Sequence, residues 1–176
     1  MEIKAKCRYD LESTRALTHL ATFKKSNPKK RIILYNIITS VLLAIVILEF
    51  VFFGPDMTLY LLLLTVLLLG FLENFLYFIL PKISFKKMST FRNAENEFVF
   101  CDDVLKISSK TKEYSGEGQI EYTALVKVYE TSRYFFLLQT ERQTYIVDKS
   151  TIENGTAEDI RNKLISKIEK YIICKY

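Results

Sequence analysis

The chain has 176 residues, a net charge of +5 and a hydrophobic fraction of 49%. Residues 1–31 hold nine Lys or Arg against three Asp or Glu, whereas residues 93–176 hold 12 against 14. A nucleic-acid-binding domain gathers cations on itself to neutralise phosphates, so this distribution argues against nucleic-acid binding. The scattered cysteines Cys7, Cys101 and Cys174 match no disulfide framework or metal-ligand spacing, and we expect free thiols.

The first nine residues alternate between apolar and charged side chains. Ile3, Ala5 and Cys7 fall on one side of this pattern, and a period of two predicts a half-buried strand. A lone strand is unstable, so we expect it to add to the C-terminal sheet or to a partner's sheet. A short helix should follow, with Ser13 as its N-cap, and Asn27-Pro28 should end it.

Two apolar runs, residues 32–53 and 59–80, occupy the middle of the chain. Each run has 22 residues, and a helix of that length is about 33 Å long. The hydrocarbon core of a bilayer is about 30 Å thick. The turn between the runs, at Gly54-Pro55, must lie at a membrane surface, because backbone inside hydrocarbon has to satisfy its own hydrogen bonds. We therefore expect a transmembrane helical hairpin over residues 32–80.

Cations lie at one end of this hairpin only. Five precede the first run and four follow the second, namely Lys24, Lys25, Lys29, Lys30, Arg31, Lys82, Lys86, Lys87 and Arg92, and the turn carries none. The positive-inside rule then predicts a multi-pass protein of the cell membrane with both termini in the cytoplasm. Basic residues beside a membrane helix attract anionic headgroups. The candidate headgroup contacts are Lys29, Lys30, Arg31, Lys82, Lys86 and Lys87.

Asn36, Glu73 and Asn74 form a candidate polar site inside the membrane. Counted along the second run, Glu73 lies about 5 Å to the cytoplasmic side of the midplane. One interpretation makes Glu73 a proton or cation site, because ionisable groups at depth often mark pathways. The other is an interhelical clasp, in which a protonated Glu73 hydrogen-bonds to Asn36 or to a second copy of the chain.

After a leader (residues 1–31) and the hairpin, we expect a basic linker (81–97) and a C-terminal domain (98–176). Apolar stretches separated by turn residues predict strands at 98–100, 104–108, 119–123, 126–130, 134–139 and 144–148. Between them, Asp102-Asp103 reads as a turn and Gly116-Glu117-Gly118 as a hairpin tip. Thr156 and Asp159 can cap a final helix, whose apolar stripe comprises Ile160, Leu164, Ile168 and Ile172.

The residue types that carry catalysis are not arranged in a recognisable pattern. His19 is the single histidine and is expected to be a solvated surface residue, which cannot build a usual zinc site alone. A Cys–His pair with Cys7 or Cys101 lacks an activating motif. We therefore expect no catalytic, cofactor-binding or metal-binding residues, and a protein that is not an enzyme.

The order of parts resembles the YcxB-like family of bacterial membrane proteins, and the resemblance covers most of the chain. It is carried by residues 96–103, by 120–122 leading to 126–131, and by 134–138 and 145–149. The chain departs from the family at Asp148, where proline is common before the lysine. The family is similar in outline to membrane-tethered pleckstrin-homology-like domains, which implies a β domain closed by a helix. It implies no substrate and no catalytic residues.

These observations predict an α+β membrane protein, with a two-helix hairpin and a small cytoplasmic pleckstrin-homology-like β domain closed by a C-terminal helix. Its expected function is non-enzymatic binding or regulation at the cytoplasmic face, with the lipid bilayer and a protein partner or homo-oligomer as partners. Two alternatives stay open: a small transporter or channel subunit that uses Glu73, and an immunity or self-protection membrane protein. No nucleic acid or cofactor is expected.

Overall fold

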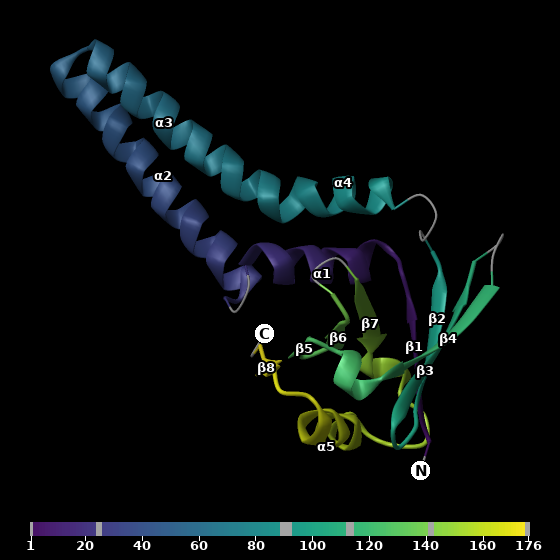
Figure 1. Ribbon diagram of the computed structural model, residues 1–176. Coiled ribbons are helices and arrows are strands. Elements are labelled where there is room, and N and C mark those ends of the chain that lie inside the picture. The colour runs from purple at the N-terminus through teal and green to yellow at the C-terminus, as the bar shows by residue number, and fades with distance from the viewer. Residues whose placement is uncertain (1, 24–25, 89–92, 112–114, 141–142, 175–176) are drawn as a thin grey trace.

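The computed structural model describes residues 2–23, 26–88, 93–111, 115–140 and 143–174. It is an α+β structure with two four-stranded sheets and two long apolar helices. In Figure 1 the apolar helices α2 (Pro28–Phe53) and α3 (Met57–Asn74) project as a hairpin from a compact β body. Helices α1 and α4 lie side by side between the hairpin and the body.

The first strand, β1 (Ile3–Arg8), completes a sheet whose other strands come from far along the chain. It pairs antiparallel with β2 (Glu95–Phe100), from Ile3 opposite Phe100 to Arg8 opposite Glu95. Its inward side chains are buried and its charged ones exposed, as the alternation predicts. The expectation that this strand joins the C-terminal sheet is therefore confirmed.

Helix α1 (Leu11–Phe23) begins two residues before the expected cap. Asp10 accepts a hydrogen bond from the Ser13 backbone N–H through Oδ1 (2.8 Å), and Ser13 Oγ accepts one from the Asp10 N–H (3.0 Å). Asp10 is therefore the N-cap, and the prediction of Ser13 for this role is wrong. Ser13 provides the return half of the capping box instead.

The hairpin helices extend beyond the predicted runs. Asn27 caps α2 by accepting from the backbone N–H groups of Lys29 and Lys30, and Pro28 occupies the first turn, where its missing N–H costs nothing. Asp56 caps α3 across the turn, where Gly54 has a φ of 80° that favours glycine. Asn27-Pro28, predicted to end the short helix before the hairpin, is therefore the start of α2.

Helix α3 continues through a π-helical turn, η1 (Phe75–Ile79), into α4 (Leu80–Lys87). Part of the segment expected as a linker is thus helical. Pro81 sits in the first turn of α4, and the π-helical turn before it accommodates the hydrogen bond that proline cannot donate.

The first sheet has the order β1-β2-β3-β4, with β3 at Val104–Lys110 and β4 at Ser115–Glu121. The expectation that Gly116-Glu117-Gly118 forms a hairpin tip is wrong, because these residues lie within β4 and pair with Ser109, Ser108 and Ile107. Tyr122 leaves the expected strand and lies buried in the 3₁₀ turn η2 (Tyr122–Ala124). The Asp102-Asp103 turn connects β2 to β3 as expected.

The second sheet has the order β7-β6-β5-β8. Its strands are β5 (Lys127–Glu130), β6 (Tyr134–Leu138), β7 (Thr144–Asp148) and β8 (Tyr171–Ile173). The expectation that β6 is central is confirmed. The 3₁₀ turn η3 (Lys149–Thr151) follows β7, and helix α5 (Ala157–Lys167) has the predicted Thr156–Asp159 capping box.

The apolar stripe predicted that the chain ends in a helix, but the last described element is a strand. Helix α5 ends at Lys167, and β8 follows and pairs in parallel with β5, with Ile172 opposite Tyr129. The spacing of four between Ile168 and Ile172 fits a helix, but backbone pairing with β5 stabilises a strand here. Ile160 and Leu164 are fully buried as expected.

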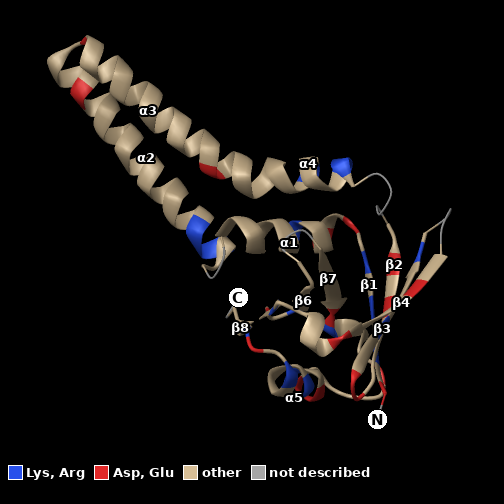
Figure 2. Ribbon diagram, viewed as in Figure 1, with Lys and Arg blue, Asp and Glu red and all other residues tan. Residues whose placement is uncertain are grey.

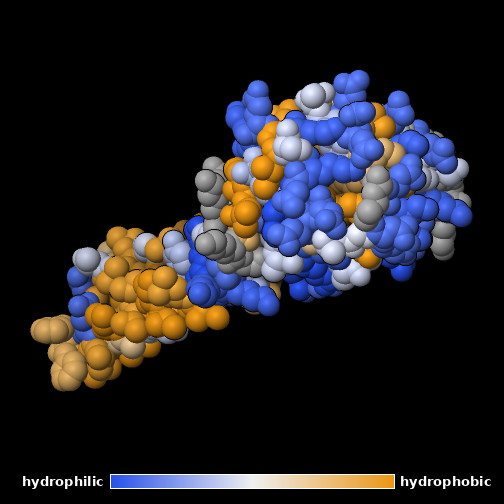
Figure 3. Space-filling view, turned by 90° about the horizontal axis from the view of Figure 1, so that it is seen from below, coloured by the Kyte–Doolittle hydropathy of each residue, from blue (hydrophilic) through white to orange (hydrophobic). Residues whose placement is uncertain are grey.

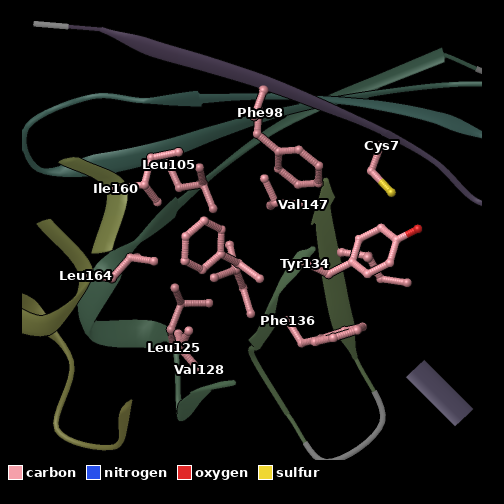
Figure 4. Close-up of a cluster of buried hydrophobic side chains, with 14 of the residues drawn as sticks. Cys7, Phe98, Leu105, Leu125, Val128, Tyr134, Phe136, Val147, Ile160 and Leu164 are labelled. Carbon is pink, nitrogen blue, oxygen red and sulfur yellow. The ribbon is translucent and has the colours of Figure 1, made fainter. Parts of the chain in front are cut away.

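The body has one core, formed between the two sheets and closed on one side by α5 (Figure 4). Phe98 from the first sheet, Phe136 and Val147 from the second, and Ile160 from α5 are all fully buried. Gly155, which precedes α5, is packed so closely against β1 that an added Cβ would lie 2.9 Å from Ile3 Cγ1. Close packing therefore joins β1 to the rest of the body.

Candidate functional site

The surface of the α2–α3 hairpin is apolar almost throughout. Residues Pro28–Phe53 and Met57–Lys87 are long and apolar enough to cross a membrane, by length and composition. Most of their large apolar side chains are exposed; Phe53 is 85% exposed, whereas Val46 and Val66, between the helices, are 3% exposed. Figure 3 shows this contrast, with an apolar hairpin beside a largely hydrophilic body.

Two of the three predicted polar residues meet between the hairpin helices. Asn74 Nδ2 donates to Asn36 Oδ1 (2.9 Å) and to the carbonyl oxygen of Gly70 (2.8 Å). Gly70 lies against Thr39, since a Cβ at Gly70 would be 2.9 Å from Thr39 Cγ2. Small residues allow close helix approach in membranes, and amides across helices add hydrogen bonds. This part of the site is an interhelical clasp.

Glu73 does not bond to Asn36, the partner that the sequence suggested. Its Oε1 accepts from Arg31 Nη2 (3.2 Å) instead. Glu73 and Asn74 are neighbours on the helix and point in different directions, so only one of them faces Asn36. Arg31, expected as a headgroup contact, is held in the protein, where its guanidinium also lies 5.2 Å from the ring centres of Phe23 and Tyr35. Arg31 Nε and Glu73 Oε2 are buried without a hydrogen-bond partner among the described residues.

His19 connects α1 to the bend at the base of the hairpin. It is 8% exposed, so the expectation of a solvated histidine is wrong. Its Nε2 lies 3.0 Å from the carbonyl oxygen of Tyr77, and its ring stacks on Tyr77 with 4.5 Å between centroids. Tyr77 is four residues before Pro81, which has no N–H to donate to that carbonyl. His19 therefore supplies a donor where the helix lacks one, and burial lowers its pKa below 6.5.

The remaining candidate headgroup residues are exposed near the base of the hairpin. They are Lys29 and Lys30 at the start of α2, and Lys82, Lys86 and Lys87 on α4. Figure 2 shows cations at these two places and none along the helices between them. Lys24, Lys25 and Arg92 lie outside the described residues.

A buried ionic network in the body was missed at the sequence level. Glu130 is 2% exposed and accepts from Lys149 Nζ (2.6 Å), Arg161 Nε (2.8 Å) and the Tyr171 hydroxyl (2.5 Å). Burial raises the pKa of Glu130, but these hydrogen bonds outweigh burial and lower it from 4.5 to about 2. Strand alternation places Glu130 on the same face as buried Val128, a signal that could have identified it. The network joins β5, η3, α5 and β8.

The environments of Cys7, Asp102 and Asp103 in the body indicate structural roles. Burial raises the pKa of Cys7 to about 12, so it is a thiol at neutral pH and not the thiolate that a nucleophile needs. Asp102 and Asp103 are paired with Lys163 and Lys167 of α5. The described residues contain no group of three His, Cys, Asp or Glu side chains placed to hold a metal ion.

The segment from β3 to α5 is similar to a known protein family. Residues 106–164 match the family model described as YcxB-like protein. No curated protein and no solved structure matches the chain. The resemblance proposed from the sequence is thus shown for this YcxB-like segment, whereas the motif at residues 96–103 lies before it.

Asp148 has a defined role in the YcxB-like segment. It caps η3 by accepting from the Ser150 backbone N–H (2.9 Å) and hydroxyl (2.7 Å). Its second oxygen accepts from Arg133 (3.1 and 3.2 Å), which also pairs with Glu12 of α1. Aspartate at this position therefore helps to hold α1 on the body.

Proposed function

We propose that the protein is a non-enzymatic, membrane-anchored binding module whose β body lies at the cytoplasmic face. In this proposal α2 and α3 cross the membrane, and the body is a pleckstrin-homology-like domain. The observation that carries the proposal is the placement of charge: residues 32–81 contain no Lys or Arg, and exposed lysines lie at the body end of both helices. Such asymmetry favours retention of that end in the cytoplasm.

The pairing of β1 with β2 gives independent support for the hairpin topology. β1 precedes α2, and β2 follows α4, yet the two strands form a continuous antiparallel ladder. Two paired strands must lie on the same side of a membrane, so an even number of crossings separates them. Both ends of the hairpin therefore leave the membrane on that side. The two sheets and α5 support the pleckstrin-homology-like fold in outline.

Cysteine labelling of the full chain in intact cells tests the orientation. A cysteine at Pro55, exposed in the turn, should react with a membrane-impermeant maleimide added outside. A cysteine at Ser115, exposed on the body, should react only after permeabilisation. Labelling of Ser115→Cys in intact cells, or of both sites only after permeabilisation, would contradict the proposal. The parent chain, with Cys101 partly exposed, is the labelling control.

Lipid selectivity tests the expected headgroup contacts. In bilayers with spin-labelled lipids, the full chain should prefer phosphatidylglycerol to phosphatidylcholine, and salt should weaken the preference. Each lysine near the surface contributes about 1 kcal/mol before screening. Replacing Lys82, Lys86 and Lys87 with Gln should therefore reduce the preference several-fold. The matched control replaces three exposed lysines of the body, Lys106, Lys110 and Lys170; equal effects of the two triple variants would contradict a role for α4.

Transport through Glu73 is the alternative from a different class. The ion pair with Arg31 gives Glu73 a structural role, and two helices cannot enclose a pore, so transport requires an oligomer. Flux across vesicles that collapses in Glu73→Gln, with the hairpin still assembled, would favour this alternative. The self-protection alternative has no specific structural observation in its favour.

A further inference from the structure

The outer edge of strand β4 is unpaired within the described part of the chain. β4 ends its sheet, whereas β1, at the other end, is bridged by backbone hydrogen bonds between Lys4 and Glu153 (3.0 and 2.8 Å). In Figure 1 the β3–β4 ribbon extends away from the second sheet. Natural edge strands are commonly protected by lysine, proline or a bulge. Residues Ser115–Glu121 contain neither lysine nor proline, and all seven pair in continuous register with β3.

The inward face of β4 has a hollow beside its glycines. Gly118 lies opposite Ile107, and a Cβ added at Gly118 would meet nothing within 4 Å. The hollow measures about 340 Å³, and its apolar lining includes Ile107, Ile120 and Tyr145. Apolar side chains of a neighbouring strand can cover a glycine of this kind. The inward face can therefore receive an apolar side chain from an added strand.

The outward face of β4 is acidic. Glu117 and Glu121 are exposed there, and β4 itself carries no cation. Lys106 on β3 lies opposite Gln119, between the two glutamates, so the nearest paired cation is on the side away from the free edge. Opposite charges on adjacent strands stabilise their pairing, and like charges destabilise it. An added strand should therefore present cations on this face.

We propose that the free edge of β4 binds an extended segment of a partner protein in which apolar side chains alternate with lysine or arginine. The segment adds a fifth strand to the sheet, with its apolar side chains in the hollow beside Gly118 and its cations beside Glu117 and Glu121. Strand addition takes its affinity from main-chain hydrogen bonds and its specificity from alternate side chains. This inference deepens the proposed function by naming the kind of partner, and rests on it only for the side of the membrane where the partner is met.

The test uses the full chain in lipid nanodiscs and a synthetic peptide as the probe. The peptide has seven residues, the length of β4, and alternates lysine with phenylalanine or valine. Binding is followed by fluorescence anisotropy of the labelled peptide, and hydrogen exchange of the β4 amides locates it. We expect saturable binding that slows exchange in β4 and not in β8. Two control peptides, one with glutamate for lysine and one N-methylated at alternate amides, should bind at least about tenfold more weakly.

Protein variants separate the contribution of the hollow from that of the acidic face. A Cβ at Gly118 meets nothing within 4 Å, so Gly118→Val should fold. Because the valine fills the hollow, this variant should bind the peptide at least about tenfold more weakly. Glu117→Lys with Glu121→Lys should weaken the lysine peptide and strengthen the glutamate peptide. Glu169→Lys, a charge reversal at an exposed site after α5, is the matched control and should leave binding unchanged.

Several outcomes would overturn the proposal. These are no binding at about 1 mM peptide, equal binding of the N-methylated peptide, or equal binding by Gly118→Val. Concentration-dependent protection of β4 without peptide would show that a second copy occupies the edge. None of these results depends on which side of the membrane the body lies, so the labelling experiment can fail or succeed independently.

Discussion

The hairpin and the β body place their apolar side chains in opposite ways. In the body, apolar side chains point inward, and Phe98, Leu105 and Phe135 are fully buried. In the hairpin most of them point outward, and the interface between the helices combines Val46 and Val66 with Gly70, Thr39 and two asparagines. Water drives the first arrangement, whereas in hydrocarbon helices associate through close packing and hydrogen bonds. Under the proposed membrane anchoring the two parts of the chain meet different solvents, and a given substitution should affect only one part.

The largest expected effect concerns the body alone. Glu130→Ala leaves Lys149 and Arg161 without their buried partner, and loss of one member of a buried pair costs about 3–5 kcal/mol. Hydrogen exchange of β5 and β8 amides in the full chain should speed up strongly, while exchange in α2 and α3 stays unchanged. The exposed control, Glu169→Ala, should have little effect. Acceleration in the hairpin of equal size would show that the two parts unfold together.

Glu130 also gives the body a pH dependence of defined sign. Its pKa in the folded protein is about 2, below the ordinary value of 4.5. Its contribution to stability is complete above pH 4.5 and is lost as the pH falls toward 2. The free energy of unfolding of the body should therefore fall less between pH 4.5 and pH 2 in Glu130→Gln than in the parent chain.

A smaller effect should be confined to the hairpin. In Gly70→Ala the new methyl group would lie 2.9 Å from Thr39 Cγ2, so the helices must separate slightly, at a cost of about 1–3 kcal/mol. Cross-linking between cysteines placed in α2 and α3 should become less efficient. Thr39→Ser removes the opposing methyl group and should restore cross-linking in the double variant. Failure of this rescue would mean that the predicted contact does not limit helix approach.

The smallest effect should appear at the junction between the two parts. His19→Phe keeps an aromatic ring beside Tyr77 but removes the Nε2 donor, a loss of about 1 kcal/mol. Burial lowers the pKa of His19, so its stabilising contribution is complete above pH 6.5 and falls as the solution becomes more acidic. The protection of α1 amides, taken as exchange relative to the intrinsic rate at each pH, should fall between pH 7.5 and pH 5 in the parent chain and less so in the variant. An unchanged pH profile would contradict this role.

Sequence periodicity predicted most of the elements, because alternation and apolar runs report directly on strands and apolar helices. It could not predict features that depend on distant parts of the chain. Ile172 fits a helical stripe, and only the position of β5 makes it a strand residue. Gly118 looks like a turn residue until its pairing with Ile107 is known.

The sequence predicted which residues form the candidate site but not which of them bond to each other. Asn36, Glu73 and Asn74 do lie at one level of the hairpin, but Arg31 was assigned to lipid because its reach back to Glu73 depends on how the helices are aligned. His19 was assigned to the surface because burial by α4 and the bend at Pro81 are properties of the assembled structure.

The ladder between β1 and β2 has a consequence for biosynthesis. β1 is made before both apolar helices, yet its partner β2 follows Pro28–Lys87. Until β2 leaves the ribosome, the β1 backbone has no strand to pair with, and by then both apolar helices have already been made. Completion of the sheet is therefore a late event that follows synthesis of the hairpin. A nascent chain that stops at residue 88 should keep an unpaired, protease-sensitive N-terminal strand, whereas one that extends through β4 should protect it.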